Sequence, residues 1–173
     1  MGYPLPDGYH YPMDDPSISL EEGMRILPLW VTSYYGHGDT LETLSLHDSL
    51  IEPTPTVVRM SPEDLTLAFH QPPSLHDWTD PIILRSGIRR GVFSRLREAA
   101  LFARDNAEVA WPNVEFRYVW CDHSVWLMPW GIWSFHAELE QARKSRKGVR
   151  THSAVRMRGA NHCVCIIFHT TPL

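Results

Sequence analysis

The chain has 173 residues, of which 43% are hydrophobic, and its formal net charge is -4 at pH 7. This length and composition allow one domain with a buried core, and the slightly acidic balance excludes the basic footprint of a nucleic-acid-binding protein. No apolar run approaches the roughly 18 residues that would span a membrane, and the opening residues lack the pattern of a signal peptide.

The first half of the sequence predicts short helices separated by irregular segments. Prolines break residues 1–19, so we expect a loop there. Ser19, with a glutamate three residues later, has the pattern of a capping box and predicts a helix that runs to about Tyr35. The stretch GHG at 36–38 then ends that helix as a turn. Ser61, followed by a proline and two acidic residues, predicts a second helix start.

The second half predicts helix, strand, helix and strand in turn, over about 88–109, 114–120, 131–146 and 153–158. Apolar residues recur at three- and four-residue steps along the first helix: Ile88, Val92, Leu96, Ala99 and Ala103. Apolar and polar residues alternate in both strand segments. A strand, a helix of this length and a further strand form a parallel crossover, which places the two strands side by side.

The stretches WPNVEFRYVWCDHSVW and VRTHSAVRMRGANH, in this order, resemble the C-terminal part of an α/β-hydrolase fold protein. In that fold, loops after the last two parallel strands carry the catalytic acid and the catalytic histidine. The resemblance implies an α/β class: a partial α/β-hydrolase-like fold with few parallel strands, packed helices and an irregular helical cap. It divides the chain into a cap- or lid-like region at 1–85 and a hydrolase-like region at 86–173.

The sequence departs from the hydrolase pattern at the nucleophile. No serine has a glycine two residues before it and two residues after it, so the Gly-x-Ser-x-Gly elbow is missing. A His-Gly-Gly oxyanion stretch is also absent, and we interpret GHG at 36–38 as a turn. We therefore expect a hydrolase-like protein, related to ester or carbon-bond hydrolases, that is not catalytic alone.

Two site residues follow from the resemblance. His162 in RGANH takes the position of the catalytic base; the alternative is a structural loop histidine beside an Asx turn of Asn161. Asp122 follows the first strand, where the acid often lies; the alternative is a surface turn carboxylate. In the commonest register, with Cys121 at the place of the turn glycine, Ser124 rather than Asp122 takes the place of the acid.

Three tryptophans, Trp126, Trp130 and Trp133, are candidates for the wall of a pocket that binds a small hydrophobic ligand. The alternative is packing of a helix on the sheet. The cysteines Cys121, Cys163 and Cys165 are too few for a disulfide framework, which predicts a reducing, cytoplasmic setting. Their spacing from nearby histidines matches no standard zinc motif, so we expect no metal and no cofactor.

Three functions remain open from the sequence. The first is the hydrolase-like protein described above. The second is a non-catalytic accessory module that binds a small hydrophobic molecule. The third is an incomplete gene product, in which an exposed sheet edge leads to marginal stability and self-association. Neither nucleic acid nor a membrane is an expected partner.

Overall fold

The computed structural model describes residues 2–69, 83, 86–102, 114–145 and 148–163. Within these ranges the structure contains α-helices, short 3-10 helices and one small sheet. The elements, in chain order, are α1 (Leu20–Thr32), η1 (Leu41–Thr43), η2 (Thr56–Arg59), α2 (Pro62–Ala68), α4 (Val92–Leu101), β1 (Phe116–Cys121), α5 (Leu127–Lys144) and β2 (His152–Met157).

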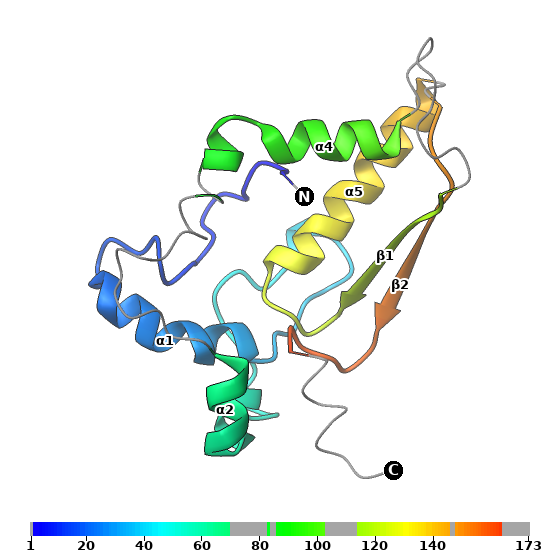
Figure 1. Cartoon of the computed structure of the whole chain (residues 1–173). Coiled ribbons are helices and arrows are strands. Elements are labelled where there is room, and N and C mark those ends of the chain that lie inside the picture. Colours follow the sequence, from blue (N-terminus) through cyan, green and yellow to red (C-terminus); the bar gives the residue numbers. More distant parts are fainter. Residues whose placement is uncertain (1, 70–82, 84–85, 103–113, 146–147, 164–173) are drawn as a thin grey trace.

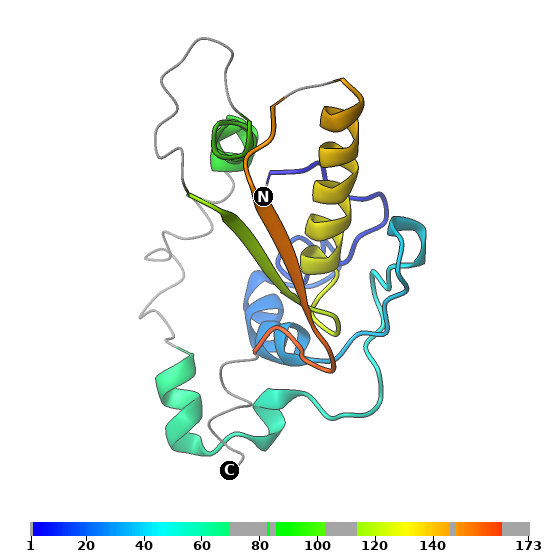
Figure 2. The same ribbon diagram turned by 90° about the vertical axis from the view of Figure 1, so that its right-hand side faces the viewer.

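The two strands pair in parallel, as the strand-helix-strand pattern predicts. Their register runs from Phe116 opposite His152 to Cys121 opposite Met157. Helix α5 lies alongside both strands on one side of the sheet (Figures 1 and 2). The described part of the chain is therefore an α/β structure with a small parallel sheet. Because the strands are parallel, the loops that follow them both leave from the C-terminal end of the sheet.

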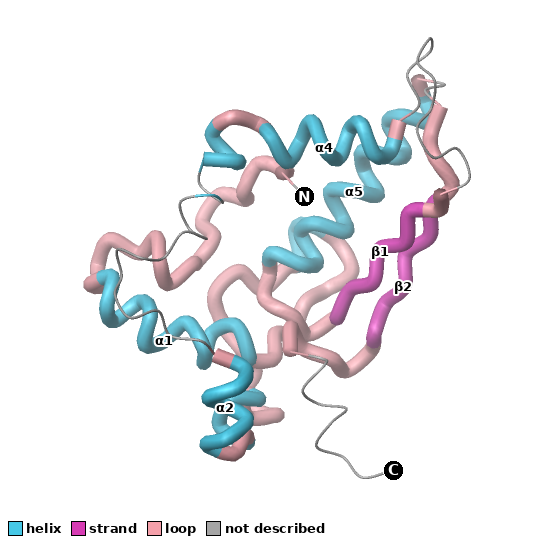
Figure 3. Tube along the Cα trace, in the orientation of Figure 1, coloured by secondary structure: helices cyan, strands magenta, loops and turns pink. Residues whose placement is uncertain are grey.

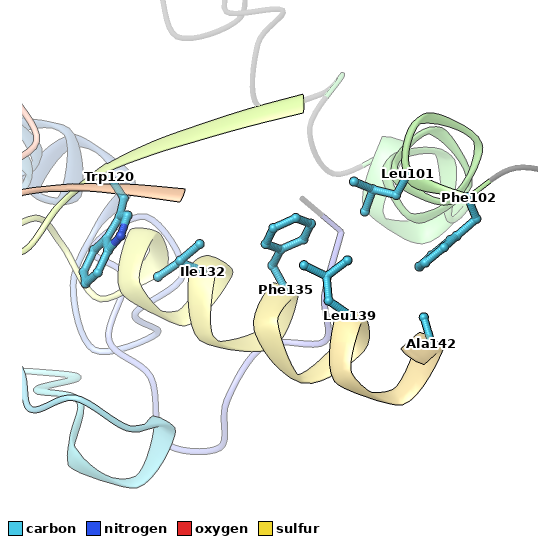
Figure 4. Close-up of a cluster of buried hydrophobic side chains, with 7 residues drawn as sticks. All are labelled: Leu101, Phe102, Trp120, Ile132, Phe135, Leu139 and Ala142. Carbon is cyan, nitrogen blue, oxygen red and sulfur yellow. The ribbon is translucent and has the colours of Figure 1, made fainter. Parts of the chain in front are cut away.

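Helix α5 carries the core of the second half. Its buried residues recur at three- and four-residue steps, as the sequence predicts. Arg143 and Lys144 lie in its last turn, where positive charge stabilises the C-terminal end of a helix. Figure 4 shows the side chains of Ile132, Phe135, Leu139 and Ala142 pointing from α5 toward the strands and α4. The buried hydrophobic cluster consists of Leu101, Phe102, Trp120, Ile132, Phe135, Leu139 and Ala142.

The predicted helix over 88–109 is wrong in its extent and in its buried face. Gly91 adopts a left-handed conformation with φ 61°, which interrupts the helix before α4 begins at Val92. Leu96 is 62% exposed, whereas Leu101 is completely buried. The buried side also carries Arg97, whose Nε donates to Glu138 of α5 at 2.9 Å. Residues 103–109 lie outside the described residues.

The first half is irregular between its helices, as Figure 3 shows. Ser19 caps α1 by accepting from the Glu22 amide, and Ser61 caps α2 by accepting from the Asp64 amide. Helix α1 ends at Thr32, three residues before the predicted end. Both helices lie at the end of the molecule toward which β1 and β2 point (Figure 1). The boundary predicted between residues 85 and 86 touches residues outside the described ranges.

In the part of the chain that the structure describes, the sheet face opposite α5 carries exposed apolar side chains. Val119 and Val155 are paired on it and are 55% and 45% exposed. Parallel sheets in proteins usually have both faces covered, and the marginal stability expected from the sequence stays a prediction. Self-association through an exposed sheet edge stays a prediction as well.

Replacing Phe135 by alanine should lower the free energy of unfolding by about 3–5 kcal/mol, because it empties the centre of the core. Replacing the exposed Leu96 by alanine is the control and should cost less than about 1 kcal/mol. Urea unfolding of both variants measures the difference. Equal losses would show that α5 does not form the core described here.

Candidate functional site

The loops after the two strands form the candidate site. The loop after β1 spans residues 122–126, and the described part of the loop after β2 covers residues 158–163. Main-chain hydrogen bonds join them: the Asp122 amide donates to Met157 O at 3.2 Å, and the His123 amide donates to Ala160 O at 3.0 Å. The first bond keeps the register of the strands, and the second joins the loops outside that register. Together they bring the two loops into contact.

Ser124 and His162 meet between these loops. The Ser124 hydroxyl lies 3.1 Å from Nδ1 of His162, within hydrogen-bond distance. Ser124 is completely buried, whereas His162 keeps an exposed side. Partial burial of the imidazole lowers the pKa of His162 below its usual value. The ring is therefore neutral at pH 7 and can accept a proton.

Asp122 binds elsewhere in the same pair of loops. Its carboxylate accepts from Nε of Arg156 at 3.1 Å and from the Gly159 amide at 2.8 Å. Gly159 has a positive φ of 71°, so this turn suits glycine. Arg156 also donates to Asp39 at 2.7 Å. The bond to Gly159 joins the two loops, and Arg156 of β2 links Asp122 to Asp39 in the first half of the chain. The role of Asp122 as the acid stays a prediction. The residue in hydrogen-bond contact with His162 is Ser124, which takes the position of the acid in the commonest register.

Asn161 fixes the loop that carries His162. Its Oδ1 accepts from the Cys163 amide at 3.0 Å, which is the Asx turn considered from the sequence. Its Nδ2 donates to Thr32 O at 2.6 Å and to Thr56 Oγ1 at 2.8 Å. Asn161 is completely buried, and these bonds satisfy its amide. The Asn-His pair thus joins an anchor residue to a histidine that reaches the surface.

Residues that follow α1 also contact the site, and the sequence gives no signal for them. The Tyr35 amide donates to His123 O at 3.1 Å, and Nδ1 of His123 lies 2.8 Å from Tyr35 O. Next to this pair, Nε2 of His37 lies 2.7 Å from Ser124 O. The first half of the chain therefore supports the loop after β1 through one main-chain hydrogen bond and two bonds between a histidine side chain and a carbonyl oxygen.

The three predicted pocket tryptophans make packing contacts. The indole nitrogens of Trp126 and Trp130 donate to His10 O at 2.7 Å and to Pro4 O at 2.9 Å, and Trp133 packs edge-on against Trp120. Trp126 and Trp130 thereby attach the N-terminal segment to the start of α5. An open depression elsewhere includes none of them. It is lined by Leu5, Met13, Asp14, Asp15, Pro16, Ile88 and Arg89.

Within the described ranges, no group of three or more histidine, cysteine, aspartate or glutamate side chains is placed to hold a metal ion. Cys165, one of the residues considered for such a site, lies outside those ranges. Among the helices that the structure describes, none has the length and apolar character needed to cross a membrane.

Comparisons with protein-family models, with curated proteins and with solved structures find no match to this chain. The candidate site is therefore defined by its own geometry.

Replacing Thr56 by valine should lower the free energy of unfolding by about 1–3 kcal/mol, because a buried amide hydrogen of Asn161 loses its acceptor. The matched control is Thr66→Val. Thr66 is exposed and donates only within α2, to Pro62 O. Chemical unfolding compares the two variants, and a loss for Thr56→Val no larger than that of the control would contradict the anchoring role of Asn161.

Proposed function

We propose that this chain carries part of an α/β-hydrolase-type active site, namely the catalytic histidine and the residue that orients it. His162 is the general base, and Ser124 orients its ring. The observation that supports this most directly is the 3.1 Å contact between Ser124 Oγ and His162 Nδ1. It lies at the carboxyl ends of two neighbouring parallel strands, where such folds place their acid and their base.

General base catalysis requires one ring nitrogen of His162 to be fixed by a hydrogen bond and the other to face the group that loses its proton. When Nδ1 carries the hydrogen and donates to Ser124, Nε2 is left as a proton acceptor. The lowered pKa of His162 keeps the ring in the neutral form that can act as a base at pH 7. The exposed side of His162 leaves room for a hydroxyl group or a water molecule to approach.

Burial assigns Ser124 the orienting role. A nucleophilic serine needs its hydroxyl open to the substrate, and Ser124 is completely buried. Ser124 also lacks the glycines two residues before and after it that a nucleophile elbow requires. We therefore assign it to the position that a carboxylate takes in a complete triad.

Two features predict that the isolated chain does not catalyse ester hydrolysis. The sequence has no nucleophile elbow, and the partner of His162 is an uncharged hydroxyl. A carboxylate stabilises the imidazolium that forms when the base takes a proton, whereas a serine hydroxyl offers no charge. The proposed site therefore orients the His162 ring but does not stabilise its protonated form as a carboxylate would.

The binding-module alternative receives less support. The indole groups of Trp126 and Trp130 are engaged with main-chain carbonyls of the N-terminal segment. Their packing gives them a structural role that does not require a ligand.

The isolated chain should show no saturable turnover of short- and medium-chain p-nitrophenyl esters. The variant His162→Ala should have the same background rate, because a base without a nucleophile gives little rate enhancement. Initial rates over a range of ester concentrations test this. Saturable turnover that disappears in His162→Ala would contradict the prediction that the chain is inactive, and it would mean that a nucleophile is present. Cys121 would then be the first residue to replace in the search for that nucleophile.

Replacing Ser124 by aspartate should raise the pKa of His162 by roughly one pH unit or more, because a carboxylate beside Nδ1 stabilises the charged ring. Ser124→Asn has nearly the same size without the charge, and it should leave the pKa much closer to that of the unmodified chain. NMR titration of the His162 ring measures both. Equal pKa values in the two variants would place residue 124 away from the imidazole and remove the basis of the proposal.

A further inference from the structure

His37, the histidine of the GHG stretch, bonds to two separate main-chain segments. Its Nε2 lies 2.7 Å from the carbonyl oxygen of Ser124, and its Nδ1 lies 3.1 Å from the amide nitrogen of Ser45. The ring also stacks on Tyr35, with centroids 6.0 Å apart and an angle of 14° between the planes. The sequence interpretation of GHG as a simple turn leaves these contacts unexplained.

The two contacts determine the protonation of the His37 ring. A carbonyl oxygen can only accept a hydrogen bond, so Nε2 carries a hydrogen and donates it to Ser124 O. A main-chain amide can only donate, so Nδ1 has no hydrogen and accepts from Ser45. Only the neutral Nε2–H tautomer makes both bonds at once. Protonation of Nδ1 would place two N–H groups opposite each other and break the bond to Ser45.

The groups around His37 agree with a neutral ring. Burial lowers the pKa of His37, and His123 adds to that effect. The hydrogen bond to Ser124 and the carboxylate of Asp122 act in the opposite direction, and the net result is a lowered pKa. His37 is therefore neutral at pH 7, the form that the geometry requires.

Ser124 links His37 to the candidate base. Its carbonyl oxygen accepts from His37, and its hydroxyl contacts Nδ1 of His162. A residue held at its main chain has fewer orientations available to its side chain. We propose that His37 is a positioning residue of the site: it fixes the main chain of Ser124 so that the Ser124 hydroxyl meets His162. This inference rests on the proposed function, because it names the residue that supports the orienting contact.

The experiment reads the 15N chemical shifts of the His162 ring at pH 8, where the ring is neutral. His37→Phe keeps a flat ring beside Tyr35 and removes both hydrogen bonds, so the His162 Nδ1 resonance should shift. His37→Gln should leave that resonance in place, because a neutral amide can donate to Ser124 and accept from Ser45. His47→Gln is the matched control on the same segment, since His47 is exposed and contacts Gly8 O.

A double-mutant cycle with Ser124→Ala separates this inference from the proposed function. Ser124→Ala should itself shift the His162 Nδ1 resonance, and adding His37→Phe should shift it no further. No shift in Ser124→Ala would overturn the orienting contact, and with it the proposed function. A shift in Ser124→Ala together with none in His37→Phe would overturn the role of His37 alone.

If His37→Phe does not fold, His37→Asn replaces it. The asparagine amide is too short to reach both Ser45 and Ser124 at once, so the same shift of the His162 Nδ1 resonance is expected. An asparagine variant with the resonance of the unmodified chain would overturn the inference.

Discussion

The parallel pairing of β1 with β2 is the constraint on which the candidate site depends. It brings two loops, 38 residues apart at Ser124 and His162, to the same edge of the sheet. Helix α5 makes that pairing possible, because its buried face covers the strands and packs against Trp120 and the end of α4. Without this crossover, Ser124 and His162 would have no reason to approach each other.

The first half of the chain contributes several hydrogen bonds to the site. Thr32 and Thr56 accept from the buried amide of Asn161, and His37 donates to the carbonyl of Ser124. Buried polar groups are costly when left unpaired and position a structure well when satisfied. The irregular region therefore acts as a support for both loops, with His162 left at the surface between them.

Much of the second half could be predicted, because its signals are local. Alternation in β1 and the spacing of Ile132, Phe135 and Leu139 in α5 depend only on neighbouring residues, and the structure confirms both elements. The buried face of α4 could not be read from its apolar residues, because an ion pair between Arg97 and Glu138 occupies that side. The roles of Ser124 and His37 depend on contacts between distant segments. The register after β1 pointed to Ser124, whereas nothing local to GHG indicated that His37 contacts the site.

The most direct test of this account is an experimental measurement of the distance between Ser124 Oγ and His162 Nδ1, by crystallography of the whole chain. The account predicts a hydrogen-bond distance of about 2.6–3.2 Å, with Ser124 buried and the other ring nitrogen facing solvent. A separation beyond about 4 Å, or a ring that turns Nε2 toward Ser124, would contradict it.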